Sequence, residues 1–176
     1  MFTIIIVVLL ATLSFTQQER SIVGEVSVPA PVAEVYNAWT TEDGAKTFFA
    51  PDCKIVLKAY GEYEMYFLAD AEPGSRGGEG CKVLGFEKNK MLSFTWNAPP
   101  SLPDVRKHFT HVTVYFLSVG DSVTKVKLIH DGWGAGDEWD KAFNYFSAAW
   151  LKIVLPRLKY RFEHGPVNWD NPPKLN

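Results

Sequence analysis

The chain has 176 residues, a length that suggests one domain. Hydrophobic residues make up 47% and aromatic residues 14%, enough to fill a sizeable core and also to line a cavity. The formal net charge is −2 and there is no basic block, so binding to a phosphate backbone has little support. We therefore expect no nucleic-acid partner.

Residues 1–20 are predicted to be a secretory segment. Residues 4–10 are apolar and uncharged. This run is shorter than the ~20 residues that a membrane-spanning helix needs, and it is typical of the apolar part of a signal peptide. The small residues Ala11 and Ser14 are compatible with cleavage nearby. We expect a secreted or periplasmic protein with no stable membrane span after removal of the segment; an uncleaved anchor and a buried strand are the alternatives.

The mature chain opens with a strand predicted at 22–28 and a helix at 32–40. Pro31 suits the first turn of that helix. Three- and four-residue spacings give the helix one apolar face, formed by Val32, Val35, Tyr36 and Trp39.

Six further strands are predicted from alternating polarity and from the turn residues between them. They span 54–59, 63–68, 80–86, 91–97, 108–119 and 124–130. Because successive side chains of a strand point to opposite faces, parity assigns one face of each strand to the interior. The inward residues are Tyr63, Met65, Phe67, Leu92, Phe94, Trp96, Val112, Val114, Phe116, Val126, Leu128 and His130.

A long aromatic helix is predicted over 137–163, kinked or divided at Pro156 and ended by Gly165. Its apolar positions are Trp139, Phe143, Phe146, Trp150 and Ile153. The order strand, helix, six strands, long helix indicates an α+β fold with an antiparallel sheet. A curved sheet around one helix does not easily fill its own middle, so a pocket for an apolar ligand is expected there.

The two cysteines, Cys53 and Cys81, fall on predicted strands separated by one other strand. That separation is ~10 Å, too far for a disulfide unless the middle strand stops early or bends. Two small buried hydrophobic residues are the alternative. Neither has a His or Cys neighbour at metal-ligand spacing, so no metal and no cofactor are expected.

The residues at 28–40, 83–96, 130–133 and 139–158 resemble the START-like superfamily, also called SRPBCC or helix-grip. Within it they resemble the AHSA-type domain family, named after the activator of the heat-shock-protein ATPase. The resemblance covers 21–169 and leaves 170–176 as a tail. It implies a helix-grip fold of order β-α-β6-α, with a cavity between the sheet and the C-terminal helix. It implies no particular ligand, and polyketide cyclases are relatives by fold only.

The candidate ligand-binding residues form a floor on the sheet and helix 32–40, and a lid on the C-terminal helix. The floor is Tyr36, Trp39, Tyr63, Met65, Phe67, Phe94, Trp96, Val112, Val114, Phe116 and His130; the lid is Trp139, Phe143, Phe146 and Trp150. The alternative is that they are all ordinary core. His130 is expected to point inward, either to orient a ligand or act as a general base, or to be a buried histidine with hydrogen-bonded partners.

The first functional hypothesis is an exported domain that binds a small apolar or amphipathic molecule. A cyclase- or dehydratase-like enzyme with His130 as acid or base is the second. A protein-interaction domain with a solid core is the third. No catalytic triad, nucleophile elbow or zinc-protease motif is present in the sequence, so no catalytic residue is nominated.

Overall fold

The computed structural model describes residues 20–175. Residues 1–19 of the predicted secretory segment lie outside the described residues, so export stays a prediction. Within 20–175, no helix combines the length and the apolar character that crossing a membrane requires.

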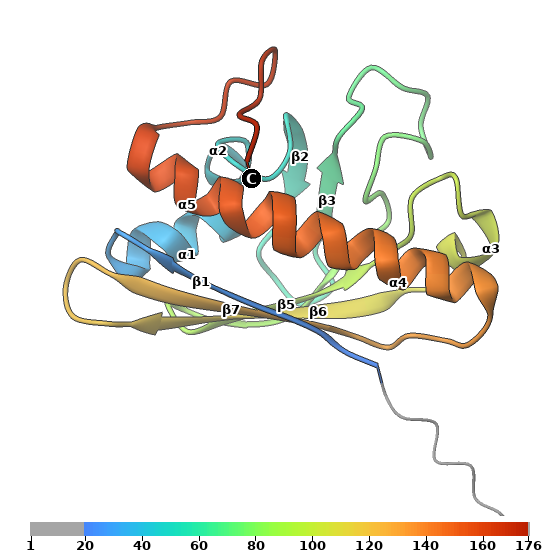
Figure 1. Cartoon of the computed structure of the whole chain (residues 1–176), viewed down its shortest axis with the longest axis horizontal. Coiled ribbons are helices and arrows are strands. Elements are labelled where there is room, and N and C mark those ends of the chain that lie inside the picture. The colour runs from blue at the N-terminus through green and yellow to red at the C-terminus, as the bar shows by residue number, and fades with distance from the viewer. Residues whose placement is uncertain (1–19, 176) are drawn as a thin grey trace, which may run out of the picture.

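A five-stranded antiparallel sheet forms the base of the molecule (Figure 1). Its strands are β1 (Ile22–Val28), β7 (Thr124–Asp131), β6 (Thr110–Ser118), β5 (Met91–Trp96) and β4 (Val83–Glu87), in that spatial order. Alternate residues of β5, β6 and β7 are buried, as the predicted parity requires. One face of the sheet therefore carries the core.

The strands β2 (Asp52–Ile55) and β3 (Tyr63–Tyr66) form a separate two-stranded ladder. An isolated bridge between Glu62 and Lys82 connects this hairpin to β4. The seven strands occur in the predicted order, but the sheet does not continue as a regular ladder from β4 to β3. The break lets the hairpin curve over the core.

Two short helices, α2 (Glu42–Ala45) and α3 (Pro103–Arg106), lie between the predicted elements, where no helix was expected. Helix α1 (Val32–Thr40) has its predicted bounds. The Thr41 hydroxyl caps α2 by accepting a hydrogen bond from the Gly44 amide at 3.1 Å. Four-residue helices carry too little periodic signal to be recognised in a sequence.

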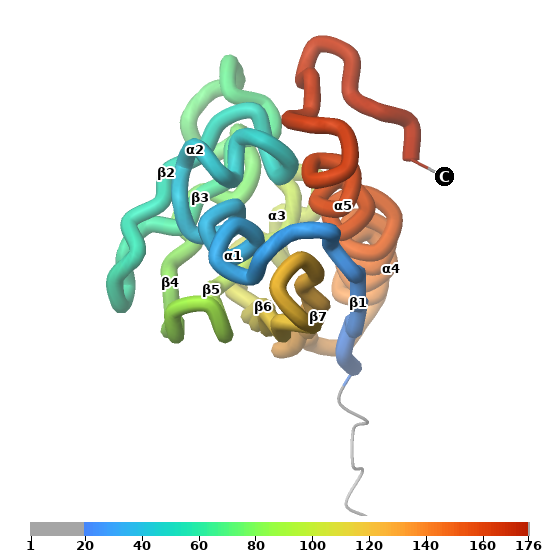
Figure 2. Tube along the Cα trace, turned by 90° about the vertical axis from the view of Figure 1, so that its left-hand side faces the viewer, coloured from blue at the N-terminus to red at the C-terminus, as the bar shows by residue number. Residues whose placement is uncertain are grey.

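The C-terminal helix consists of α4 (Asp137–Ala149), the π-helical segment η1 (Trp150–Val154) and α5 (Leu155–His164). It lies over the β1 side of the sheet (Figures 1 and 2). Gly24 on β1 permits this close approach, because a Cβ there would lie 2.5 Å from the Leu151 Cδ2 atom. The curved antiparallel sheet with its long C-terminal helix confirms the predicted α+β class.

Candidate functional site

The C-terminal helix changes from α to π pitch at Trp150–Val154, and this change sets the direction of its apolar side chains. Pro156 has no N–H and its ring would clash with a preceding carbonyl in a regular α-helix. Just before it, the Leu155 N–H donates to the Trp150 carbonyl, five residues back. Such single π turns occur often at functional sites. Here the wide turn carries Trp150, whose ring packs against Phe49 and Trp96.

An open apolar cleft lies between this helix and the end of β3. It consists of two adjoining hollows of about 210 and 290 Å³ that share Phe67, Trp96, Tyr145 and Phe146. The first hollow is also lined by Phe49, Ala149, Trp150, Ile153, Val154 and Arg157, and the second by Leu68, Ser75, Arg76, Gly77, Gly78, Asn97, Pro99 and Pro100. The cleft has a largely apolar wall with arginine side chains at its two ends.

Three aromatic rings in mutual contact form the floor of the cleft. The ring centroids of Trp96 and Trp150 are 5.5 Å apart, and Phe49 lies 5.7 Å from Trp96 and 5.6 Å from Trp150. Phe67 stands at the rim, 6.4 Å from Trp96, and 40% of its surface is exposed. These distances fit favourable aromatic packing, so the floor is rigid while the rim is accessible.

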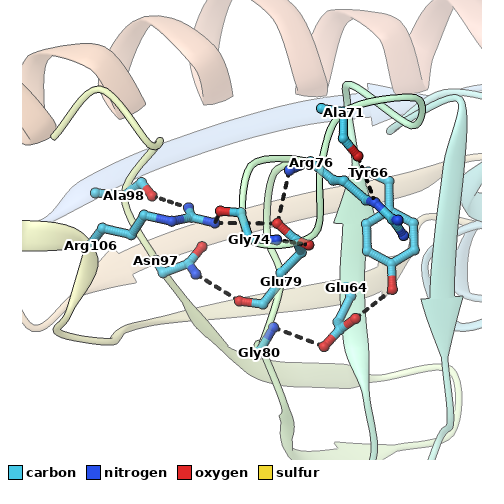
Figure 3. Close-up of polar contacts among 10 residues, drawn as sticks. All are labelled: Glu64, Tyr66, Ala71, Gly74, Arg76, Glu79, Gly80, Asn97, Ala98 and Arg106. Carbon is cyan, nitrogen blue, oxygen red and sulfur yellow. Dashed lines mark hydrogen bonds and ion pairs between the residues drawn. The ribbon is translucent and has the colours of Figure 1, made fainter. Parts of the chain in front are cut away.

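A polar network fixes the glycine-rich loop at 74–80, which forms the far wall of the cleft (Figure 3). The Glu79 carboxylate accepts hydrogen bonds from the Gly74 and Arg76 amides at 2.6 and 2.8 Å. It also lies 3.6 Å from the Arg106 guanidinium, and Arg106 donates to the Gly74 carbonyl at 2.9 Å. Asn97 Nδ2 donates to the Glu79 carbonyl at 2.8 Å. One carboxylate thus ties the loop to the segment after β5.

The same network continues to the base of the hairpin. Glu64 accepts from the Gly80 amide at 2.8 Å and from the Tyr66 hydroxyl. Arg106 also donates to the Ala98 carbonyl. Gly78 is buried against Trp96, where a Cβ would come within 3.1 Å of the indole ring. A side chain larger than hydrogen at this position would push the loop away from the cleft floor.

His130 is fully buried and both of its ring nitrogens are paired. Trp150 Nε1 donates to His130 Nδ1 at 2.9 Å, and His130 Nε2 lies 2.7 Å from the Thr110 hydroxyl. Because an indole N–H only donates, Nδ1 must be the acceptor and the neutral ring carries its proton on Nε2. Burial lowers the pKa of His130 from 6.5 to about 3. The ring is therefore neutral and fully engaged.

The structure brings four of the predicted site residues to the cleft: Phe67, Trp96, Phe146 and Trp150. It places the remaining floor residues, Tyr36, Trp39, Tyr63, Met65, Phe94, Val112, Val114, Phe116 and His130, in a packed core. Trp139 and Phe143 lie elsewhere on α4, where Phe143 packs 5.2 Å from Trp133. The space expected in the middle of the sheet is thus filled by side chains, and the accessible space opens at its side. Ligand contact by the buried group stays a prediction.

Several lining residues were not nominated from the sequence. Phe49 lies in a segment for which no helix or strand was predicted, and Tyr145 and Arg157 fall between the predicted apolar positions of the helix. No residue of the glycine-rich loop at 74–80 was nominated from the sequence, yet Gly77 and Gly78 line the cleft. Segments that meet only through tertiary packing leave no periodic pattern in the sequence.

A sheet and helix arranged in this way define a START-like domain of the helix-grip type. The sequence profile of the family described as "Activator of Hsp90 ATPase homolog 1-like protein" matches residues 29–163. The chain belongs to this family, as its motifs predicted. A comparison with curated protein sequences finds no match.

Solved structures share the fold at low sequence identity. The Aha1 dimer from Colwellia psychrerythraea is 23% identical, with a TM-score of 0.59, over 83% of this chain and 98% of that one. The HSP90 activator PFC0360w from Plasmodium falciparum is 19% identical, with a TM-score of 0.58, over 77% and 90%. Protein EF2215 from Enterococcus faecalis is 17% identical, with a TM-score of 0.65, over 90% and 77%. Identities at this level establish the fold alone.

Proposed function

We propose that this domain binds a small apolar or amphipathic molecule in the cleft between the C-terminal helix and the end of β3. The observation that carries the proposal is the aromatic floor of Phe49, Trp96 and Trp150 beneath an accessible rim. Burial of apolar ligand surface against such a floor contributes about 25 cal/mol per Å². Concave sites with apolar walls and a few polar groups are typical of small-molecule sites.

Exposed apolar side chains around the rim support the proposal. Leu68, Tyr145 and Ile153 expose 63%, 51% and 42% of their surfaces beside Phe67. Clusters of exposed apolar residues in soluble domains mark binding surfaces more often than scattered ones do.

The enzyme hypothesis that used His130 as acid or base has less support. Proton transfer to a ligand would require breaking the hydrogen bond to Trp150 or the one to Thr110. The low pKa of the ring also makes it a weak base near neutral pH. His130 instead fixes the orientation of the Trp150 ring, which is part of the binding surface.

Titration with N-phenylnaphthylamine, a neutral apolar fluorophore, tests the proposal. We expect saturable emission, sensitised by tryptophan, from the wild-type protein. Ala149→Phe fills the first hollow and should abolish binding. Ala148→Phe, one residue away on an exposed face, is the matched control and should bind as the wild type does. Absence of saturable binding, or equal binding by both variants, would contradict the proposal.

Residues 1–20 extend the proposal to export, because their apolar run is typical of a signal peptide. Amino-terminal sequencing of the protein recovered from the periplasm or the culture medium tests this part. A mature terminus near residue 20 is expected. Recovery only from the cytoplasm with Met1 intact would contradict it.

A further inference from the structure

Arg157 closes one end of the cleft, and its side chain has no hydrogen-bond or ion-pair partner among residues 20–175. Its side chain lines the first hollow, and its guanidinium carbon lies 5.2 Å from the centre of the Trp169 ring. Among residues 20–175 no carboxylate oxygen lies within 4.0 Å of it, and its buried Nε has no acceptor. Asp70 and Asp170 line the neighbouring surface hollow but remain beyond that distance. The Arg157 side chain is thus half-buried, and its buried Nε has no acceptor among the described residues.

The other arginines near the cleft have partners. Arg106 is held by Glu79 and by two backbone carbonyls. At the opposite end of the cleft, Arg76 donates from Nε to the Ala71 carbonyl at 3.1 Å and lies over the Tyr66 ring. Of the two arginines that line the cleft, Arg157 is therefore the one whose side chain makes no hydrogen bond to the described residues.

The surroundings of Arg157 make a bound anion favourable. Burial lowers the pKa of its guanidinium, and no neighbouring carboxylate offsets this effect. Removing a charge from water is costly unless a charge of opposite sign pairs with it. A guanidinium presents a planar fork of donors that fits a carboxylate or phosphate in two parallel hydrogen bonds. No carboxylate of residues 20–175 lies within ion-pair distance of Arg157, so a ligand can supply that anion.

We infer that the ligand is an amphiphile with an anionic head, which pairs with Arg157 while its apolar body lies on Phe49, Trp96 and Phe146. This inference rests on the proposed function, because it assigns a ligand class to the same cleft. Carboxylate and phosphate heads share the required chemistry. The apolar body supplies affinity, and the arginine selects the charged member of a pair of otherwise similar molecules.

Displacement of N-phenylnaphthylamine by decanoate and by decanol tests the inference, since the two compete with the same alkyl body but differ in charge. The measured quantity is the ratio of the dissociation constant of decanol to that of decanoate. In Arg157→Gln we expect this ratio to fall at least about tenfold, the equivalent of ~1.4 kcal/mol. Decanol should bind the variant as it binds the wild type, which also shows that the variant is folded.

Arg161→Gln is the matched control, because Arg161 is one turn further along α5 and also lacks an ion-pair partner among the described residues, but does not line the cleft. Its ratio should equal that of the wild type. An unchanged ratio in Arg157→Gln, or an equal fall in Arg161→Gln, overturns the inference and leaves the proposed function intact. Failure of the wild type to bind the neutral dye overturns both.

Discussion

Trp150 Nε1 donates a 2.9 Å hydrogen bond to His130 Nδ1, and this bond joins the floor of the cleft to the interior of the sheet. One face of the Trp150 ring lines the cleft, while its N–H points to a histidine on β7. The chain of donors continues from His130 to the Thr110 hydroxyl and from there to the Trp96 carbonyl at 2.9 Å. Both tryptophans of the floor are therefore anchored through one buried imidazole.

His130→Ala should destabilise the protein by ~2–4 kcal/mol. The substitution leaves the buried Trp150 N–H and the Thr110 hydroxyl without their partner and creates a cavity beneath the cleft. Urea unfolding monitored by tryptophan fluorescence measures the change. His111→Ala, at an exposed position on β6, should shift the free energy of unfolding by no more than ~0.5 kcal/mol. Equal effects of the two substitutions would contradict the proposed anchoring.

Protonation of His130 should make stability depend on pH. The folded-state pKa, about 3, lies below the ordinary value of 6.5, because burial disfavours the charged ring. Between these two pKa values the imidazole is protonated in the unfolded chain and neutral in the folded protein. This contribution is complete above about pH 6.5 and is lost as the pH falls toward 3, at most ~1.4 kcal/mol per pH unit.

Urea unfolding of the wild type and of His130→Gln at about pH 7 and about pH 5 measures this dependence. The two proteins share their surface carboxylates, so the contribution of these groups cancels when the free energies of unfolding are subtracted. The wild type should lose more free energy of unfolding than the variant over this interval. Parallel losses in both proteins would show that His130 does not titrate on unfolding.

Much of the fold could be predicted because strand parity and helical spacing are local properties of the sequence. Parity placed His130 on the same face as Val126 and Leu128, and all three are buried. Pro156 was expected to divide the C-terminal helix, and the π turn ends just before it. Strand parity and the missing N–H of proline were enough to predict these two features.

The position of the cleft could not be predicted in the same way. It depends on Phe49, from the loop after α2, reaching Trp96 and Trp150 across the molecule. It also depends on the core of the sheet being filled by large rings such as Tyr63 and Phe94, whose centroids are 4.3 Å apart. Periodicity shows which side chains point inward, but the space left between them is set by volume and packing.

Cys53 and Cys81 should behave as two slow-reacting free thiols. Both are buried and unpaired, and burial raises the pKa of each to about 12. β3 separates them: Cys53 pairs across β2–β3 with Met65, and the Tyr63 amide donates to the Cys81 carbonyl at 2.9 Å. Two strand spacings of ~10 Å exceed the reach of a disulfide. A chromogenic disulfide reagent should react quickly only in denaturant; rapid reaction of the folded protein would contradict this.

Glu79→Ala should loosen the glycine-rich loop and weaken binding in the cleft. The loss frees the amides of Gly74 and Arg76 and leaves Arg106 without its carboxylate, at a cost of ~1–3 kcal/mol in the free energy of unfolding. Amide hydrogen exchange over 72–80 should accelerate, and affinity for N-phenylnaphthylamine should fall. Glu72→Ala removes an exposed carboxylate from the same loop without touching this network, so its exchange and affinity should match the wild type. Unchanged exchange in Glu79→Ala would mean that the loop keeps its shape without this carboxylate.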